Sequence, residues 1–105
     1  MPPPKSEPVF NPPTPTRTTL SNGMGISVVE QRGLPIVAFG LLMDAGASQD
    51  PVNLPGLAGF TAQMLPEGTT GKSSLEIAQA FEFIGSRLSA DGRREYTLLS
   101  AETLT

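Results

Sequence analysis

The chain has 105 residues, with seven Lys or Arg, ten Asp or Glu, no His, no Cys and a formal net charge of −3. Without His or Cys it lacks the usual base for a nucleophilic Ser and the usual ligands of zinc, so we expect no metal and no other cofactor. The acidic balance and the scattered basic residues argue against nucleic-acid binding. No apolar run approaches the roughly 20 residues of a membrane-spanning helix.

Residues 1–16 hold seven of the eleven prolines. Proline lacks the amide donor that a sheet needs and favours extended backbone, so this stretch is predicted to be a flexible arm or linker. From residue 17 onward the composition is typical of a folded unit. The sequence leaves the compartment open: a signal peptide removed ahead of the arm would favour the periplasm or cell envelope, and otherwise the cytoplasm is expected.

Two segments of strand-like composition, Thr18–Leu20 and Ile26–Glu30, flank the turn signal Ser21–Gly23 and predict a β-hairpin. Farther along, Ile36–Met43 is a nearly continuous apolar run. A run of this kind is typical of a strand covered on both faces, so it is predicted to lie at the centre of a sheet.

Residues 44–51 form a predicted loop of small and turn-forming residues that includes Asp44 and Asp50. Loop aspartates commonly make Asx turns or cap helices, and this is the expected role of both. The alternative is enzymatic: Asp44, Asp50 and Glu67 are the candidate carboxylates of a metal-independent or carboxylate-metal hydrolase.

A short helix is predicted next, because Leu57, Phe60, Met64 and Leu65 recur at the spacing of one helical face. The stretch Pro66–Gly68 holds two helix breakers and is expected to end it.

A second helix is predicted to start at a capping box formed by Ser73 and Glu76. Gly85 is expected to end this helix. Its predicted apolar stripe consists of Ile77, Ala80, Phe81, Ile84 and Leu88. Two strands then close the chain, one before and one after a turn predicted at residues 91–92, with the second strand over residues 94–101.

The stretch Gly56–Thr69 resembles the active-site helix of the pitrilysin, insulinase and mitochondrial-processing-peptidase superfamily, the inverted zincins. That helix runs Gly-Leu-Ala-His-Phe-x-Glu-His-Met-Leu-x-x-Gly-Thr. The positions of this chain that match it are Gly56, Leu57, Ala58, Phe60, Met64, Leu65, Gly68 and Thr69.

In that family two histidines one helical turn apart bind zinc, and a glutamate between them is the general base. The three positions are occupied here by Gly59, Ala62 and Gln63. Only the Gln63 amide offers a donor atom, and it is a feeble zinc ligand beside imidazole. The resemblance therefore implies a protease scaffold without its zinc centre, with no catalytic residue and no metal site.

The resemblance also suggests peptide-binding residues. In family members the closing region resembles Leu-Asn-Ala-x-Thr-x-x-x-x-Thr, whose first part is an edge strand that hydrogen-bonds extended substrate. Ser89 stands at the Asn position, Ala90 and Thr97 match, and Gly92 replaces the first Thr. Ser89, Ala90 and Thr97 are therefore the candidates for binding extended peptides.

As a whole, the resemblance implies an α+β fold in which helices pack on a mostly antiparallel sheet, as part of a metallopeptidase-like sandwich. Residues 17–105 are expected to be the N-terminal portion of one processing-peptidase-like domain, because the third zinc ligand of the family lies on a later helix.

The function implied is that of a non-catalytic homologue that pairs with a catalytic zinc-peptidase subunit, or with the rest of its own domain, and helps to form the peptide-substrate chamber. Alternatives are a peptide-binding module, a structural core-type subunit of a larger complex, or a fragment of a zinc-dependent endopeptidase. Uncovered sheet edges predict an oligomer, paired through residues 96–101 or 88–90.

Overall fold

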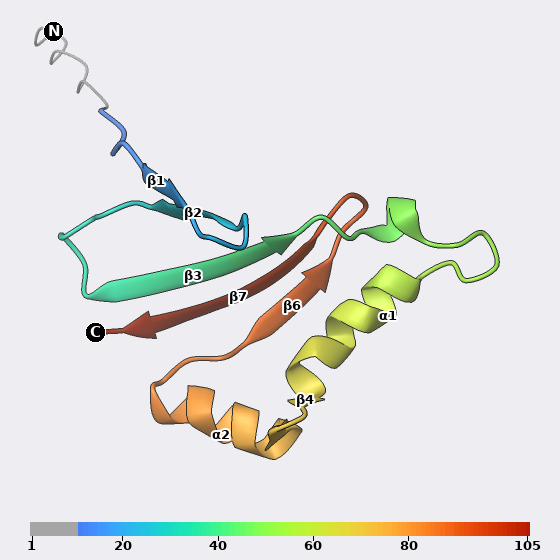
Figure 1. Cartoon of the computed structure of the whole chain (residues 1–105). Helices are drawn as coiled ribbons and strands as arrows, with labels where there is room; N and C mark the ends of the chain where they lie inside the picture. The colour runs from blue at the N-terminus through green and yellow to red at the C-terminus, as the bar shows by residue number, and fades with distance from the viewer. Residues whose placement is uncertain (1–10) are drawn as a thin grey trace, which may run out of the picture. The chain divides into compact units, whose positions relative to one another are not determined.

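The computed structural model describes residues 11–105. The chain divides into two compact units, residues 1–34 and residues 35–105, and each is described by itself (Figure 1). The arm predicted for residues 1–16 falls mostly outside the described residues, and residues 11–15 carry no regular secondary structure. None of the helices in the described part of the chain is long and apolar enough to cross a bilayer.

The first unit contains an antiparallel hairpin of β1 (Thr16–Thr19) and β2 (Gly25–Val28). Gly23 holds a positive φ of 87° in the turn, a value that glycine adopts without strain. Asn22 Oδ1 accepts a hydrogen bond from the Met24 amide at 3.1 Å. The predicted hairpin and its turn are confirmed, although both strands begin slightly earlier than the pattern predicts.

The second unit is built on a three-stranded antiparallel sheet in the order β3–β7–β6 (Figure 1). Helices and short connecting elements follow β3 and precede β6, which confirms the predicted α+β class. The strands of the sheet are β3 (Ile36–Met43), β6 (Ser89–Gly92) and β7 (Thr97–Leu104). The elements between them are η1 (Ala47–Gln49), α1 (Leu57–Met64), η2 (Leu65–Glu67), β4 (Gly68–Thr69), β5 (Lys72–Ser73) and α2 (Ser74–Phe83).

β3 has the predicted bounds but not the predicted burial. Within residues 35–105 it pairs with β7 alone, so it is an edge of this sheet and β7 is its centre. The side chains of Val37, Phe39 and Leu42 are 50%, 53% and 65% exposed. The expectation was wrong because α1 packs over β6 and β7, and β3 lies at the opposite edge of the sheet from β6.

α1 forms where the motif predicts it and ends at Met64, and the predicted breaker Pro66 lies inside η2, which follows directly. Its packing face differs from the predicted one. Leu57, Phe60 and Met64 are 42%, 65% and 50% exposed, whereas Ala62 is 1% exposed. The most buried face of the helix within this unit is therefore the one with the small residue Ala62, and the large apolar residues remain substantially exposed.

α2 begins at the predicted capping box. Ser73 Oγ accepts from the Glu76 amide at 3.4 Å, and Glu76 Oε2 accepts from the Ser73 amide at 2.8 Å. Gly85, with a φ of 67°, follows the last turn and confirms the predicted end. Ile77 of the predicted stripe is 8% exposed, but Ile84 is 48% exposed. Within this unit the stripe is therefore buried only at its first residue, while Phe81 and Leu88 are partly buried and the predicted stripe position Ala80 is exposed.

β6 and β7 confirm the predicted strand pair, but the turn between them lies later than expected. The Arg93 amide donates to the Tyr96 carbonyl oxygen at 2.8 Å, so residues 93–96 make the turn while Asp91 and Gly92 belong to β6. β7 pairs on both sides, with β3 and β6. Residues 96–101 are therefore not the free edge that the sequence suggested; within residues 35–105 the edges are β3 and β6.

The capping box generates a prediction about stability and pH. The hydrogen bond from the Ser73 amide, and next the one from its hydroxyl, lower the pKa of Glu76 below its ordinary value of 4.5. A carboxyl group with a lowered folded-state pKa stabilises the protein above its ordinary pKa, and this contribution is lost as the pH falls through the folded-state pKa. We expect the thermal midpoint to fall more steeply on acidification below about pH 5 in the parent chain than in Glu76→Gln.

The matching structural variant is Ser73→Ala, which removes the cap and is expected to lower the free energy of unfolding by about 1 kcal/mol at neutral pH. Denaturant titration measures this loss. An unchanged midpoint in Ser73→Ala, or parallel pH profiles for the parent and Glu76→Gln, would contradict the assigned role of the box.

Candidate functional site

Most of the predicted site residues lie on α1 and β6, two elements that meet in the second unit, and Thr97 is the first residue of β7. Gly59, Ala62 and Gln63, the positions of the zinc motif, lie on α1. Ser89 and Ala90 lie on β6, next to Gly92 at its end. The structure thus brings the motif helix and the predicted peptide-binding strand together.

A tight contact fixes the crossing of these two elements. A Cβ atom placed at Gly92 would lie 2.9 Å from Gly59 Cα and 3.2 Å from both the Ala58 carbonyl oxygen and Ala62 Cβ. Real Cβ atoms are essentially never found closer than 3.0 Å to another heavy atom. Only glycine at position 92 therefore allows this approach, and sequence reasoning missed it by placing Gly92 in a turn.

The loop after β3 is joined to the turn between β6 and β7. The amides of Ala47 and Ser48 donate to the carbonyl oxygens of Arg93 and Arg94 at 3.0 and 2.7 Å. Gly46, the residue before Ala47, is buried. A Cβ atom placed on it would lie 2.5 Å from the Tyr96 amide nitrogen, which is too close for any residue but glycine. The loop that leads into α1 is thereby held against the end of the sheet.

Thr97 belongs to the same junction. Its side chain is 5% exposed, and its hydroxyl donates to the Ala45 carbonyl oxygen at 2.7 Å. A side chain that is buried and already hydrogen-bonded is not available to a peptide, so the structure gives Thr97 a structural role. Peptide binding remains a prediction for Ser89 and Ala90.

Asp50 positions the start of α1. Its Oδ2 accepts from the Gly56 amide and its Oδ1 accepts from the Ala58 amide, both at 2.8 Å. Gly56 has a φ of 91°, which lets the chain turn sharply into the helix. These bonds satisfy amides that have no partner inside the helix, and the negative charge lies at the positive end of the helix dipole. The predicted capping role of this aspartate is confirmed.

The alternative carboxylate site is not assembled. Asp44 and Asp50 lie ahead of α1, whereas Glu67 follows it, and a helix of 8 residues separates the two ends by about 12 Å. Asp50 also uses both of its oxygens as a cap. Among the described residues no group of three or more His, Cys, Asp or Glu side chains could hold a metal ion.

The motif positions do not fit zinc. Gly59 has no side chain, and Gln63 offers an exposed amide, which is a poor ligand beside imidazole. The position of the general base is Ala62, which is 1% exposed and packs toward β6. The helix therefore presents neither a ligand set nor a base for metal-assisted hydrolysis.

The outer edge of β6 offers main-chain groups. Because the Arg93 amide bonds to Tyr96, the alternation of an antiparallel ladder turns the main-chain N–H and C=O groups of Ala90 and Gly92 away from β7. Within residues 35–105, β6 pairs with β7 alone. An extended peptide could add to the sheet at these two residues.

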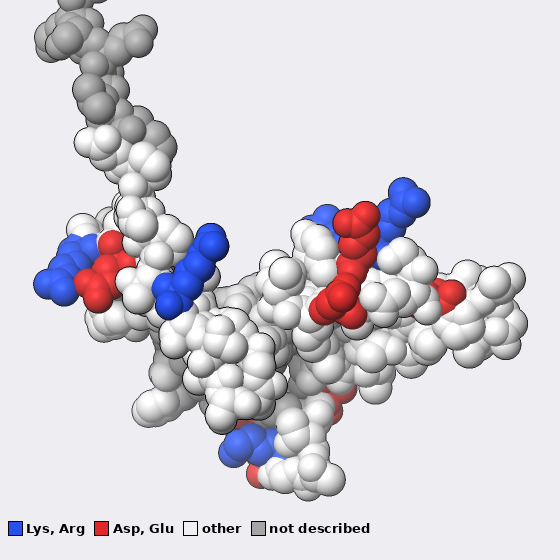
Figure 2. All heavy atoms as spheres, turned by 45° about the horizontal axis from the view of Figure 1, so that its top comes forward, with Lys and Arg blue, Asp and Glu red and all other residues white. Residues whose placement is uncertain are grey.

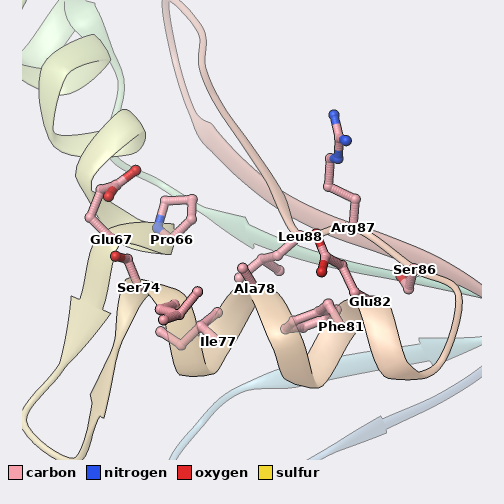
Figure 3. Close-up of a pocket in the computed structure, with 11 residues that line it drawn as sticks. Pro66, Glu67, Ser74, Ile77, Ala78, Phe81, Glu82, Ser86, Arg87 and Leu88 are labelled. Atoms are coloured by element: carbon pink, nitrogen blue, oxygen red, sulfur yellow. The ribbon is translucent and has the colours of Figure 1, made fainter.

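A separate hollow lies between α2, η2 and the segment that follows α2 (Figure 3). Its volume is about 370 Å³, and of the candidate residues named from the sequence it holds Glu67 alone, without Asp44 or Asp50. The lining is mainly apolar, from Ile77, Phe81 and Leu88, with Glu82 and Arg87 beside them. Ser86 contributes a buried hydroxyl oxygen with no hydrogen-bond partner among the described residues.

Charged side chains form small groups of mixed sign, as Figure 2 shows for one face of the molecule. Two exposed ion pairs illustrate this, Arg93 with Asp91 and Arg32 with Glu30. Exposed pairs of this kind contribute little to stability. The face shown in Figure 2 has no large patch of one sign of the kind that nucleic-acid binding needs.

The family model described as insulinase, peptidase family M16, matches residues 27–105. That range contains the whole sheet of the second unit, the motif helix and β6. The chain belongs to peptidase family M16. The resemblance inferred from the sequence of the helix is thereby confirmed, and the departures at Gly59, Ala62 and Gln63 are departures within the family.

The named relatives that this chain is similar to include zinc proteases and a processing-peptidase subunit. It is 32% identical over 88 residues to the uncharacterized zinc protease YmxG of Bacillus subtilis, covering 84% of this chain and 22% of that protein. It is 32% identical over 97 residues to the β subunit of the mitochondrial-processing peptidase of Mus musculus, covering 92% of this chain and 20% of that protein. The chain therefore spans about a fifth of the length of these relatives.

A solved structure is similar in both fold and sequence. The crystal structure of a peptidase M16 inactive domain from Pseudomonas fluorescens matches with a TM-score of 0.77 and 34% identity, over 87% of this chain and 22% of that one. This similarity confirms the predicted α+β, processing-peptidase-like fold.

The cap on α1 generates a prediction for Asp50→Asn. An asparagine has one acceptor oxygen, so its NH₂ group would face one of the two amide donors, and we expect a loss of about 1–3 kcal/mol in the free energy of unfolding. Asp44→Asn is the matched control, because Asp44 is exposed and its carboxylate accepts, among the described residues, one long hydrogen bond of 3.4 Å from Gln49 Nε2. Equal stability of the two variants in denaturant titrations would contradict the capping role.

The motif positions generate a prediction about zinc. The purified chain is expected to hold no stoichiometric zinc after dialysis, because it offers no imidazole or thiolate ligand. Elemental analysis measures the content. One tightly held zinc ion per chain would overturn the assignment of a degenerate site.

Proposed function

We propose that this chain is a non-catalytic member of peptidase family M16 that pairs with a catalytic zinc-peptidase subunit and helps to form its peptide-substrate chamber. One observation carries the proposal. The ligand and base positions of α1 are Gly59, Ala62 and Gln63, while β6 beside them keeps a free main-chain edge within residues 35–105. The chain has lost the groups for hydrolysis but not the groups for holding a peptide.

The peptide is expected to bind by adding a strand to β6. Ala90 and Gly92 supply outward main-chain donors and acceptors, and main-chain bonds of this kind hold extended peptides independently of side-chain identity. Ser89 is exposed and lies beside the groups that a peptide would meet. The loss of a metal ligand on α1 removes none of these groups.

Two comparisons support a partner-dependent function. The solved structure similar to this chain is described as an inactive domain, and one relative is named as a subunit of a processing peptidase. A chain without its own zinc centre contributes to proteolysis only beside one that has it. An M16 peptidase with an intact inverted zinc motif is therefore the expected partner, and the assembly is expected to be an oligomer.

A second candidate has a specific observation in its favour. Several relatives are named zinc proteases, and the chain spans about a fifth of their length. Under this alternative the chain is a piece of a longer protein whose zinc centre lies outside these residues. A third possibility is a peptide-binding or structural core-type subunit that acts without a peptidase partner.

Partner dependence can be tested by mixing the chain with an M16 peptidase that carries the intact motif. We expect the two to co-elute in size-exclusion chromatography with light scattering, and chelator-sensitive cleavage of a long peptide to be faster in the mixture than with the peptidase alone. Chelator-sensitive cleavage by the chain alone would overturn the non-catalytic assignment. Absence of co-elution would leave the third possibility in place of the proposed one.

Peptide binding can be tested by fluorescence anisotropy with a labelled extended peptide and the same peptide N-methylated at alternate residues. Because the methylated peptide cannot donate to β6, we expect its affinity to fall roughly tenfold or more. Ser89→Ala is expected to change the affinity little, since the binding groups are main-chain. Equal affinity for both peptides would rule out strand addition.

A further inference from the structure

We infer that the packing of α1 on β6, and not only the missing ligands, keeps this helix from carrying a zinc-hydrolase centre. This inference deepens the proposed non-catalytic function and rests on it. Position 62, where the family has its general base, is buried in the contact between α1 and β6. Positions 59 and 63, where the family has its zinc ligands, have free space around their side-chain sites. Substitution can therefore give α1 a metal, but not a metal together with its base.

The first step is the closeness of the crossing. A Cβ atom placed on Gly92 would lie 2.9 Å from Gly59 Cα and 3.2 Å from Ala62 Cβ. The methyl group of Ala62 is thus in the space that a side chain on residue 92 would need. A larger residue at either position requires α1 to move away from β6.

The second step is the burial of position 62. Ala62 is 1% exposed, one of the most buried side chains in the described part of the chain. A glutamate there would place a carboxylate against the helix–strand contact with no cationic partner nearby on α1 or β6, whose only charged residue is Asp91. Burial of an unpaired charge is costly, and the added volume strains a packed contact.

The third step is the contrast with the ligand positions. A Cβ placed on Gly59 meets no heavy atom within 4 Å, and Gln63 is exposed. These positions are four apart and lie on one helical face, the spacing at which two histidines bind zinc. Histidines there would project into open space without disturbing the crossing.

The metal half of the inference is tested with the double variant Gly59→His/Gln63→His. Without metal, its thermal midpoint is expected to stay within a few degrees of the parent's. Zinc chloride titrated into the variant is expected to bind with 1:1 stoichiometry and to raise the midpoint, because binding to the folded state stabilises it. The parent chain, treated alike, is the control and is expected to show neither effect.

The base half is tested by adding Ala62→Glu to the double variant. We expect the metal-free midpoint to fall by about 5–10 °C. Ala80→Glu in the same background is the matched control, since Ala80 is an exposed alanine of α2 and should accept the charge with little change. Equal midpoints for the two glutamate variants would overturn the inference.

A milder pair of variants decides the case if Ala62→Glu does not fold. Gly92→Ala is expected to lower the midpoint of the parent chain by several degrees, whereas Gly59→Ala is expected to leave it unchanged or raise it, because alanine favours helix and its Cβ meets open space. Equal thermal midpoints for Gly92→Ala and Gly59→Ala would contradict the inference, and so would the absence of zinc binding by the double histidine variant. These readouts are distinct from co-elution and peptide affinity, so the proposed function stands or falls separately.

Discussion

The second unit depends on one close approach, that of α1 to β6 through a pair of glycines. Gly92 lets the helix come within van der Waals distance of the strand, and Asp50 fixes where that helix begins by bonding two of its free amides. The loop that carries Asp50 is in turn held by main-chain bonds to the turn at residues 93–96. The motif helix, its loop and the strand are therefore joined directly, by the close contact at Gly92 and by these hydrogen bonds.

This arrangement keeps the family scaffold around a motif helix that lacks the zinc ligands and the base. A zinc hydrolase needs donors that point into open space and a base that reaches the same space. Here the open positions, Gly59 and Gln63, have no competent donor, and position 62 is turned into the packing against β6. The main-chain edge of β6 lies beside the helix. Its hydrogen-bonding groups belong to the backbone, so they do not depend on the side chains of the metal site.

The sequence predicts what is local and fails where non-local packing decides. The hairpin turn, the capping box at Ser73 and the Asp50 cap involve residues close in sequence with recognisable side chains, and all three are confirmed. The burial of β3 was wrong because an apolar run does not reveal which elements cover it. The packing face of α1 was wrong because it is set by Gly92, which no local pattern links to Gly59.

The register of the sheet has a consequence for how the chain folds. β3 begins at Ile36 and its partner in this position is Leu104 of β7, while Thr97 closes a contact with Ala45. These pairings join segments far apart in the sequence, so closing them costs chain entropy before any contact is gained. During synthesis on the ribosome, β3 must therefore wait, without its partner in this sheet, until β7 has emerged, and in that interval its exposed apolar side chains are open to capture by a chaperone or to aggregation.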